Sequence, residues 1–163
     1  YRVLRWKAAT GKTYQYPNEL FFIRGNEWDQ LEEQCRIELL ENNFIIHPHS
    51  DRMGYRLKGV PLVRNEKTEL VSSGVHFGTM QLLPDGQLIV LMADHQTAGG
   101  YPRIGHVISA HFPKLAQLRP NDCIHFTLVD IAMAEELLMA MQQELNILQL
   151  SCITQLNQQV CQS

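Results

Sequence analysis

The sequence lacks any cluster of basic residues and any long apolar run. Its 163 residues carry 14 Lys and Arg against 17 Asp and Glu, for a formal net charge of -3. Scattered cations offer no continuous surface to phosphates, so the composition argues against binding to nucleic acid or to an anionic membrane. The longest apolar stretch, residues 88–93, is far too short to cross a bilayer. The first residues do not have the layout of a signal peptide, and we expect a cytoplasmic protein that is a fragment of a longer chain.

Paired cysteines are also missing. The chain has no Cys-x-x-Cys, and its four cysteines are far apart: Cys35, Cys123, Cys152 and Cys161. This spacing fits neither a zinc knuckle nor a disulfide framework, so we expect reduced thiols. We also find no Cys-His arrangement that indicates a cysteine nucleophile.

What is present predicts a mainly β fold, possibly a barrel, with two helices in a single domain over residues 1–163. Expected strands cover residues 2–7, 20–24, 44–47, 54–57, 79–83, 87–92, 106–110 and 123–129. The strand at 87–92 is apolar on both faces, which is typical of a central strand. Residues 63–69 read as a surface loop, and residues 115–118 as a short turn of helix.

The helices are predicted from apolar residues at three- and four-residue spacing. One covers residues 27–41 with Asn26 as its N-cap, and the other begins at Asp130 and frays beyond Ser151. The second helix carries an apolar stripe that we expect in the core or at an intersubunit face: Ala134, Leu137, Leu138, Met141, Leu145 and Leu148.

The richest chemistry lies in a polar loop that follows the buried strand. Its side chains include a carboxylate, an amide, a hydroxyl and a phenol beside two glycines: Asp94, Gln96, Thr97, Gly99, Gly100 and Tyr101. Such a loop can bring backbone and side-chain groups together on a small polar ligand. An amide ligand needs paired donors and acceptors, which Asp94 and Gln96 supply. The same residues also build ordinary tight turns, and that alternative stays open.

Three other features have two interpretations each. Arg52, next to Asp51, could place a guanidinium fork on a carboxylate or phosphate, or the two could form a locally bonded turn. His47 and His49, followed by Asp51, have a spacing that metal sites use, but scattered surface histidines explain the same letters, and we predict no metal site. His95 could act as a general base.

Several motifs in fixed order resemble the allophanate hydrolase subunit 2 family, also called the KipA family. They are Ser50-Asp-Arg-Met-Gly-Tyr-Arg-Leu57, the Gly-x-x-x-Gly-x-x-Gln ending at Gln81, Pro84-Asp-Gly86, Asp94-x-Gln-Thr-x-Gly-Gly-Tyr-Pro102, Val107-Ile-Ser-Ala110 and Leu115-Ala-Gln-Leu-Arg-Pro120. The match runs from about residue 24 to 130 and is similar to the C-terminal half of the family's chain.

The resemblance implies a cyclophilin-like β-barrel and a partner, the family's subunit 1 or KipI-like protein. It implies part of a subunit of an ATP-dependent 5-oxoprolinase, or of a related allophanate hydrolase or urea carboxylase-type complex that processes a small amide or lactam. Asp94 and Gln96 would be catalytic, and Asp51, Arg52, Gln81, Thr97, Gly99, Gly100 and Tyr101 would bind substrate. The alternative is a KipA-type regulatory module, without chemistry, that sequesters a kinase inhibitor.

Biotin and ATP serve some members of this family. The chain has no Met-Lys-Met biotinyl motif and no Gly-x-x-x-x-Gly-Lys-Ser/Thr loop. We therefore predict no cofactor bound through a motif of this chain, with ATP entering only through the full complex.

Overall fold

The computed structural model describes residues 18–65 and 70–160. Seven strands form a closed barrel: β1 (Glu19–Arg24), β2 (Asn43–Ile46), β3 (Gly54–Lys58), β5 (Thr79–Leu82), β6 (Leu88–Leu91), β8 (Arg103–Val107) and β9 (Cys123–Leu128). Two short strands, β4 (Ser73–Gly74) and β7 (Ala98–Gly99), pair with each other in a separate sheet. The helices are α2 (Glu33–Glu41), α3 (Phe112–Gln117) and α4 (Ile131–Val160).

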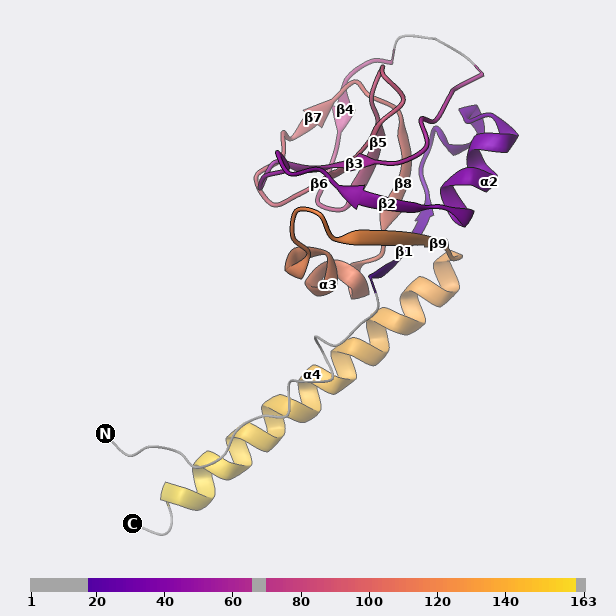
Figure 1. Ribbon diagram of the computed structural model, residues 1–163. Helices are drawn as coiled ribbons and strands as arrows, with labels where there is room; N and C mark the ends of the chain where they lie inside the picture. Colours follow the sequence, from indigo (N-terminus) through magenta and orange to yellow (C-terminus); the bar gives the residue numbers. More distant parts are fainter. Residues whose placement is uncertain (1–17, 66–69, 161–163) are drawn as a thin grey trace.

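The strand order around the barrel is β1-β8-β5-β6-β3-β2-β9, and the parallel pair β1–β9 closes it (Figure 1). Every other neighbouring pair is antiparallel. Strand β6 lies between β5 and β3, so the prediction of a central strand is confirmed. The predicted mainly β barrel is also confirmed. The strand expected at residues 2–7 lies outside the described residues.

Alternating apolar side chains fill the barrel because successive residues of a strand point to opposite faces. Phe22, Phe44 and Phe126 are fully buried, and the Phe22 and Phe126 rings meet edge-on with centroids 6.0 Å apart. Edge-on contact is a favoured geometry for aromatic pairs. Outward-facing positions on the same strands remain available to build a site.

Two short 3₁₀ turns correct the sequence-based boundaries. The helix expected over residues 27–41 begins at Glu33, after a 3₁₀ turn at Trp28–Gln30, because Leu31 bridges to Arg64 and interrupts the helix. Asn26 makes no cap, and Glu27 makes no side-chain cap either. The strand expected over 106–110 is β8, which begins earlier and ends at Val107, where the 3₁₀ turn Ser109–His111 follows.

Helix α4 begins as expected, since the Asp130 carboxylate accepts a hydrogen bond from the Met133 amide at 2.8 Å. It continues past Ser151, where we expected fraying, to Val160. The Ser151 and Thr154 hydroxyls bond to carbonyls one turn back, which satisfies them inside the helix. Glutamine, frequent here, is also a good helix former.

Most of α4 extends away from the barrel (Figure 1). Its apolar stripe is therefore not core: Leu138 is 39% exposed and Leu145 is 45% exposed. Among the described residues, no helix combines the length and the apolar character needed to cross a bilayer.

Candidate functional site

The floor of the candidate site is the outer face of three neighbouring strands. Ile89 of β6 pairs with Gln81 of β5 on one side and with Arg56 of β3 on the other. Their neighbours Met80, Leu57 and Val90 point into the core. Gln81, Ile89 and Arg56 therefore stand in a row across the outside of the barrel, with adjacent strands about 4.8 Å apart.

Gly54 makes this floor low. A Cβ at that position would lie 2.6 Å from the Ile89 Cδ1, so the isoleucine side chain occupies the space that a side chain at position 54 would need. The result is an apolar surface with a polar group at each side.

The β4–β7 sheet forms the opposite wall. The Val75 amide donates to the Thr97 carbonyl at 3.1 Å, which extends the two-residue pairing of these strands. A cavity of about 640 Å³ lies between this sheet and the barrel. It is lined by His49, Asp51, Met53, Gly54, Arg56, Ser72, Val75, Gln81, Leu83, Ile89, Leu91, Gln96, Ala98, Gly99, Gly100 and Tyr101.

Most of the residues predicted to form a site meet at this cavity. They come from three separate parts of the chain: Asp51 from the turn before β3, Gln81 from β5, and Gln96, Gly99, Gly100 and Tyr101 from the loop after β6. This convergence is the arrangement that a small-ligand site requires. The roles predicted for these residues stay predictions.

Asp94 and Arg52 do not line the cavity but bind each other. The Arg52 Nε lies 2.9 Å from Asp94 Oδ2, and its Nη2 donates to Oδ1 at 3.2 Å. The guanidinium fork expected at Arg52 is therefore present, with a carboxylate of the same chain in it. Thr97 also lies outside the lining residues.

The Asp51 carboxylate organises a local turn. Its Oδ1 accepts hydrogen bonds from the amides of Met53 at 2.8 Å and Gly54 at 3.4 Å. The locally bonded turn considered for Asp51 and Arg52 is thus present at Asp51, and it sets the start of β3 below the cavity.

The nearby histidines do not assemble a metal site. His47 and His49 lie beyond the end of β2, and the His47 Nδ1 accepts a hydrogen bond from the His49 amide at 3.1 Å. No group of three or more His, Cys, Asp or Glu in residues 18–65 and 70–160 is placed to hold a metal ion. His95 is not among the lining residues, and its Nδ1 contacts the Gln96 carbonyl.

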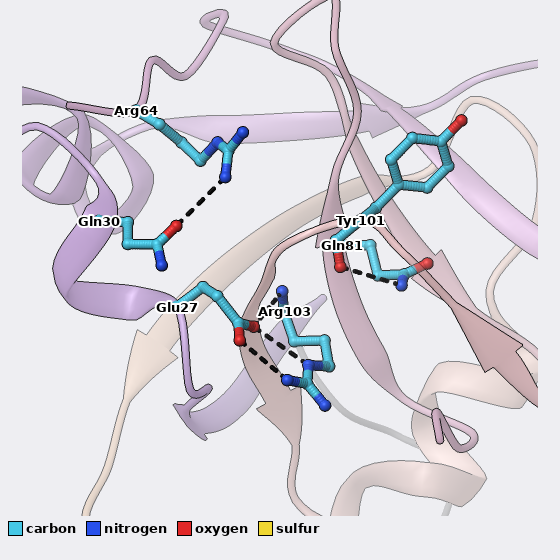
Figure 2. Close-up of polar contacts among 6 residues, drawn as sticks. All are labelled: Glu27, Gln30, Arg64, Gln81, Tyr101 and Arg103. Atoms are coloured by element: carbon cyan, nitrogen blue, oxygen red, sulfur yellow. Dashed lines mark hydrogen bonds and ion pairs between the residues drawn. The ribbon is translucent and has the colours of Figure 1, made fainter. Parts of the chain in front are cut away.

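Gln81 is the buried polar group of the site, with only 4% of its surface exposed. Its Nε2 donates to the Tyr101 carbonyl at 3.4 Å, as Figure 2 shows. A Cβ on Gly99 would lie 2.8 Å from that nitrogen. Gly99 is therefore the residue that allows the β7 backbone to approach the Gln81 amide. A register shift between β5 and β8 falls at Met80 and Gln81, and such irregularities often aim side chains at functional sites.

An ion pair that sequence reasoning missed fixes the exit of the site loop. Arg103 begins β8 directly after Pro102, and its guanidinium forms two hydrogen bonds with Glu27, at 2.8 and 3.1 Å (Figure 2). The Arg103 amide adds a third at 2.8 Å. Burial alone would raise the pKa of Glu27, but the hydrogen bonds from Arg103 outweigh it, so the pKa lies below its usual value.

A histidine pair adjoins the same strand. His76 and His106 stack with ring centroids 4.8 Å apart and planes 8° from parallel. Burial, aided by the nearby charges of His76 and Arg103, lowers the pKa of His106 to about 4. His106 is therefore neutral near pH 7, a state that suits its contact with the Thr79 hydroxyl at 3.3 Å.

Arg56, Ile89 and His49 also line the cavity but were not predicted as site residues. A signal for Arg56 exists: it lies two residues after Gly54 on a strand, so both face the same side. No comparable signal identifies Glu27, whose partner is 76 residues away.

Comparisons with known proteins agree with this architecture. Residues 4–128 match the family described as carboxyltransferase domain, subdomain A and B. The chain is 38% identical over 115 residues to a 5-oxoprolinase subunit from Haemophilus influenzae, covering 71% of this chain and 37% of that protein. It is 36% identical over 138 residues to the 5-oxoprolinase subunit of the same name from Escherichia coli (strain K12), covering 85% and 44%.

The matched part thus spans less than half of each curated relative. Among solved structures, the Kluyveromyces lactis urea carboxylase superposes with a TM-score of 0.74 at 18% identity, covering 80% of this chain and 12% of that one. This likeness concerns the fold alone. The residues that match the family include every strand of the barrel, and the match confirms the resemblance seen in the motifs. The chain belongs to the family of carboxyltransferase domains, subdomain A and B.

Proposed function

We propose that this chain is part of an enzyme complex that opens a small amide or lactam, with 5-oxoproline as substrate and ATP as the energy source. The observation that carries the proposal is its 36–38% identity to two proteins named as subunits of 5-oxoprolinase. The cavity under the β4–β7 sheet supports it, because an amide-bearing pocket of this size suits a small polar substrate. The proposed partner is a subunit 1 or KipI-like protein, in the cytoplasm.

In this proposal Gln81, Gln96 and the Gly99–Tyr101 backbone contact the substrate. Glutamine side chains and free backbone groups offer both donors and acceptors, as an amide requires. Asp94 remains the predicted catalytic carboxylate. It is bonded to Arg52, so it can act on a substrate only if that pair opens or moves with the loop.

The test is reconstitution of the complete complex, with the full-length subunit and its subunit 1 partner, followed by assay of 5-oxoproline-dependent ATP consumption. We expect turnover that Gln96→Ala lowers at least about tenfold, since a lost contact to the reacting amide is worth about 1.4 kcal/mol or more. The matched control is Gln117→Ala, an exposed glutamine at the end of α3 outside the cavity. Turnover unchanged by Gln96→Ala would remove the loop from the chemistry, and no turnover of 5-oxoproline would remove the proposed substrate.

A second candidate function is a regulatory module without chemistry that binds a KipI-like protein. The Asp94–Arg52 pair favours it, because the predicted catalytic carboxylate is held by a guanidinium outside the cavity. It predicts a stable complex that is inactive on every amide and lactam assayed. Absence of a complex after mixing the purified proteins would count against it.

A further inference from the structure

The guanidinium of Arg56 is the unpaired cation of the cavity. Arg103 is bound to Glu27 and Arg52 to Asp94, whereas the Arg56 side chain makes no ion pair or hydrogen bond with residues 18–65 or 70–160. Its backbone is fixed, since the Arg56 amide donates to the Ser50 hydroxyl at 3.1 Å. A guanidinium held at a cavity wall and left without an internal partner is suited to a planar anion.

The carboxylate of Asp51 also lines the cavity, but it does not neutralise Arg56. No ion pair joins the two side chains in the described part of the chain, and the Asp51 Oδ1 is engaged by two backbone amides. The cationic group therefore stays available to a ligand.

The amide of Gln81 lies across the floor from Arg56. Both residues pair with Ile89, one on each side, so their Cα atoms are about two strand spacings, or roughly 10 Å, apart. Their side chains rise from the same face, with the Ile89 side chain between them. This gap fits a molecule of a few heavy atoms that is polar at both ends and apolar in the middle.

The Gln81 carboxamide also restricts what can bind to it. Its Nε2 is partly used by the Tyr101 carbonyl, and its Oε1 accepts no hydrogen bond from the described residues. A carboxamide presents C=O and N–H side by side. It can pair with both groups of a lactam or primary amide, where C=O and N–H also lie on one side, but not with both groups of a trans secondary amide.

We propose that Arg56 and Gln81 determine specificity at this site: Arg56 binds the carboxylate, and Gln81 the lactam or primary amide, of one small anionic ligand lying over Ile89. The inference rests on the proposed function, which supplies the amide, and adds the requirement for a carboxylate together with the residue that reads it. Neutral lactams of the same shape are then poor ligands.

The experiment compares three probes by calorimetry on the full-length subunit: 5-oxoproline, with lactam and carboxylate; 2-pyrrolidinone, with the lactam alone; and cyclopentanecarboxylate, with the carboxylate alone. We expect 5-oxoproline to bind at least about tenfold more tightly than either of the others, a difference of about 1.4 kcal/mol. Amide NMR shifts should place it at Ile89 and Gly99.

Variants assign the two ends. Arg56→Met should weaken 5-oxoproline to the level of 2-pyrrolidinone, and Gln81→Leu should weaken both lactams. Lys58→Met is the matched control, because Lys58 is an exposed cation two residues along the same face of β3 and outside the cavity. Thermal unfolding of each variant checks that the barrel is intact.

The outcomes separate the two proposals. Equal affinity for 5-oxoproline and 2-pyrrolidinone, or unchanged 5-oxoproline binding in Arg56→Met, overturns the role of Arg56 while a lactam site remains. Binding of none of the three probes overturns both the specificity and the lactam site on which it rests.

Discussion

Glu27 and Arg103 join the turn after β1 to the first residue of β8 through a two-pronged, largely buried ion pair. The two segments also share backbone bonds, with the Gly25 amide bound to the Ile104 carbonyl and the Glu27 amide to the Arg103 carbonyl. Gly25 makes the contact possible, since a Cβ there would lie 2.1 Å from the Arg103 oxygen. The end of the site loop is thereby attached to the barrel wall.

Removal of the Glu27 carboxylate should be costly. Glu27→Ala leaves a guanidinium that is only 19% exposed without its partner, and we expect a loss of about 3 kcal/mol in the free energy of unfolding, measured in urea. Asp29→Ala is the control, because its pair with Arg36 is 3.6 Å long and 84% exposed at the carboxylate. We expect less than about 0.5 kcal/mol there. Equal effects of the two variants would show that burial of the pair adds nothing.

The two glycines of the β4–β7 sheet should respond differently to alanine. In Gly99→Ala the new Cβ would lie 2.8 Å from Gln81 Nε2, so the amide must move. We expect ligand affinity to fall roughly tenfold. In Gly74→Ala the Cβ meets nothing within 4 Å, and affinity should stay within about twofold. Calorimetry on both variants measures this, and loss of binding in Gly74→Ala would mean that the sheet itself, rather than Gln81, is sensitive.

The Arg52–Asp94 pair should behave as one unit in catalysis and contribute little to stability. Its side chains are 80% and 52% exposed, so the coupling in a double-mutant cycle of unfolding should stay below about 1 kcal/mol. We expect Arg52→Gln, Asp94→Asn and the double variant to lower turnover of the reconstituted complex by similar factors. A large loss in Asp94→Asn with normal turnover in Arg52→Gln would instead give Asp94 a role of its own.

Stability should fall in mildly acidic solution because two histidines are kept neutral in the fold. Burial, with smaller contributions from nearby cations, lowers the pKa of both His106 and His111 to about 4. In the unfolded chain the pKa is about 6.5. Between these values the unfolded state binds more protons, so stability present above pH 6.5 is lost as the pH falls toward 4.

Urea unfolding at pH 7.5, 6 and 5 measures this slope. His111 accepts a hydrogen bond from the Phe21 amide through Nδ1, at 2.9 Å, and an asparagine oxygen can replace that acceptor without titrating. His111→Asn should therefore flatten the pH dependence while retaining most of the stability at pH 7.5. A slope equal to that of the unchanged protein would contradict this assignment.

The sequence predicted the elements with strong local signals. The turn of Pro84, Asp85 and Gly86 and the apolar strand after it identify the β5–β6 hairpin, and Gly86 has the positive φ of 83° expected of that turn. The helix at 27–41 was wrong at its start because Leu31 pairs with Arg64, a tertiary contact that apolar spacing cannot reveal.

Much of the candidate site could be predicted, but not which groups are free. The loop from Asp94 to Tyr101 supplies several lining residues, as its composition indicated. That Asp94 is bound to Arg52 while Arg56 is left unpaired depends on where β3 lies relative to β6. Strand register of this kind is set by the whole barrel rather than by local sequence.

The closure of the barrel through β1 and β9 has a consequence for how the chain acquires its structure. These strands are the first and last of the barrel, and their parallel pairing aligns Glu19 with His125. Contacts between such distant segments form late and slowly, because a long loop must close first. A nascent chain that has not yet produced β9 would leave β1 and β2 each with an open edge, and such edges invite aggregation. Synthesis as far as Leu128 therefore marks the point at which this barrel can first protect itself.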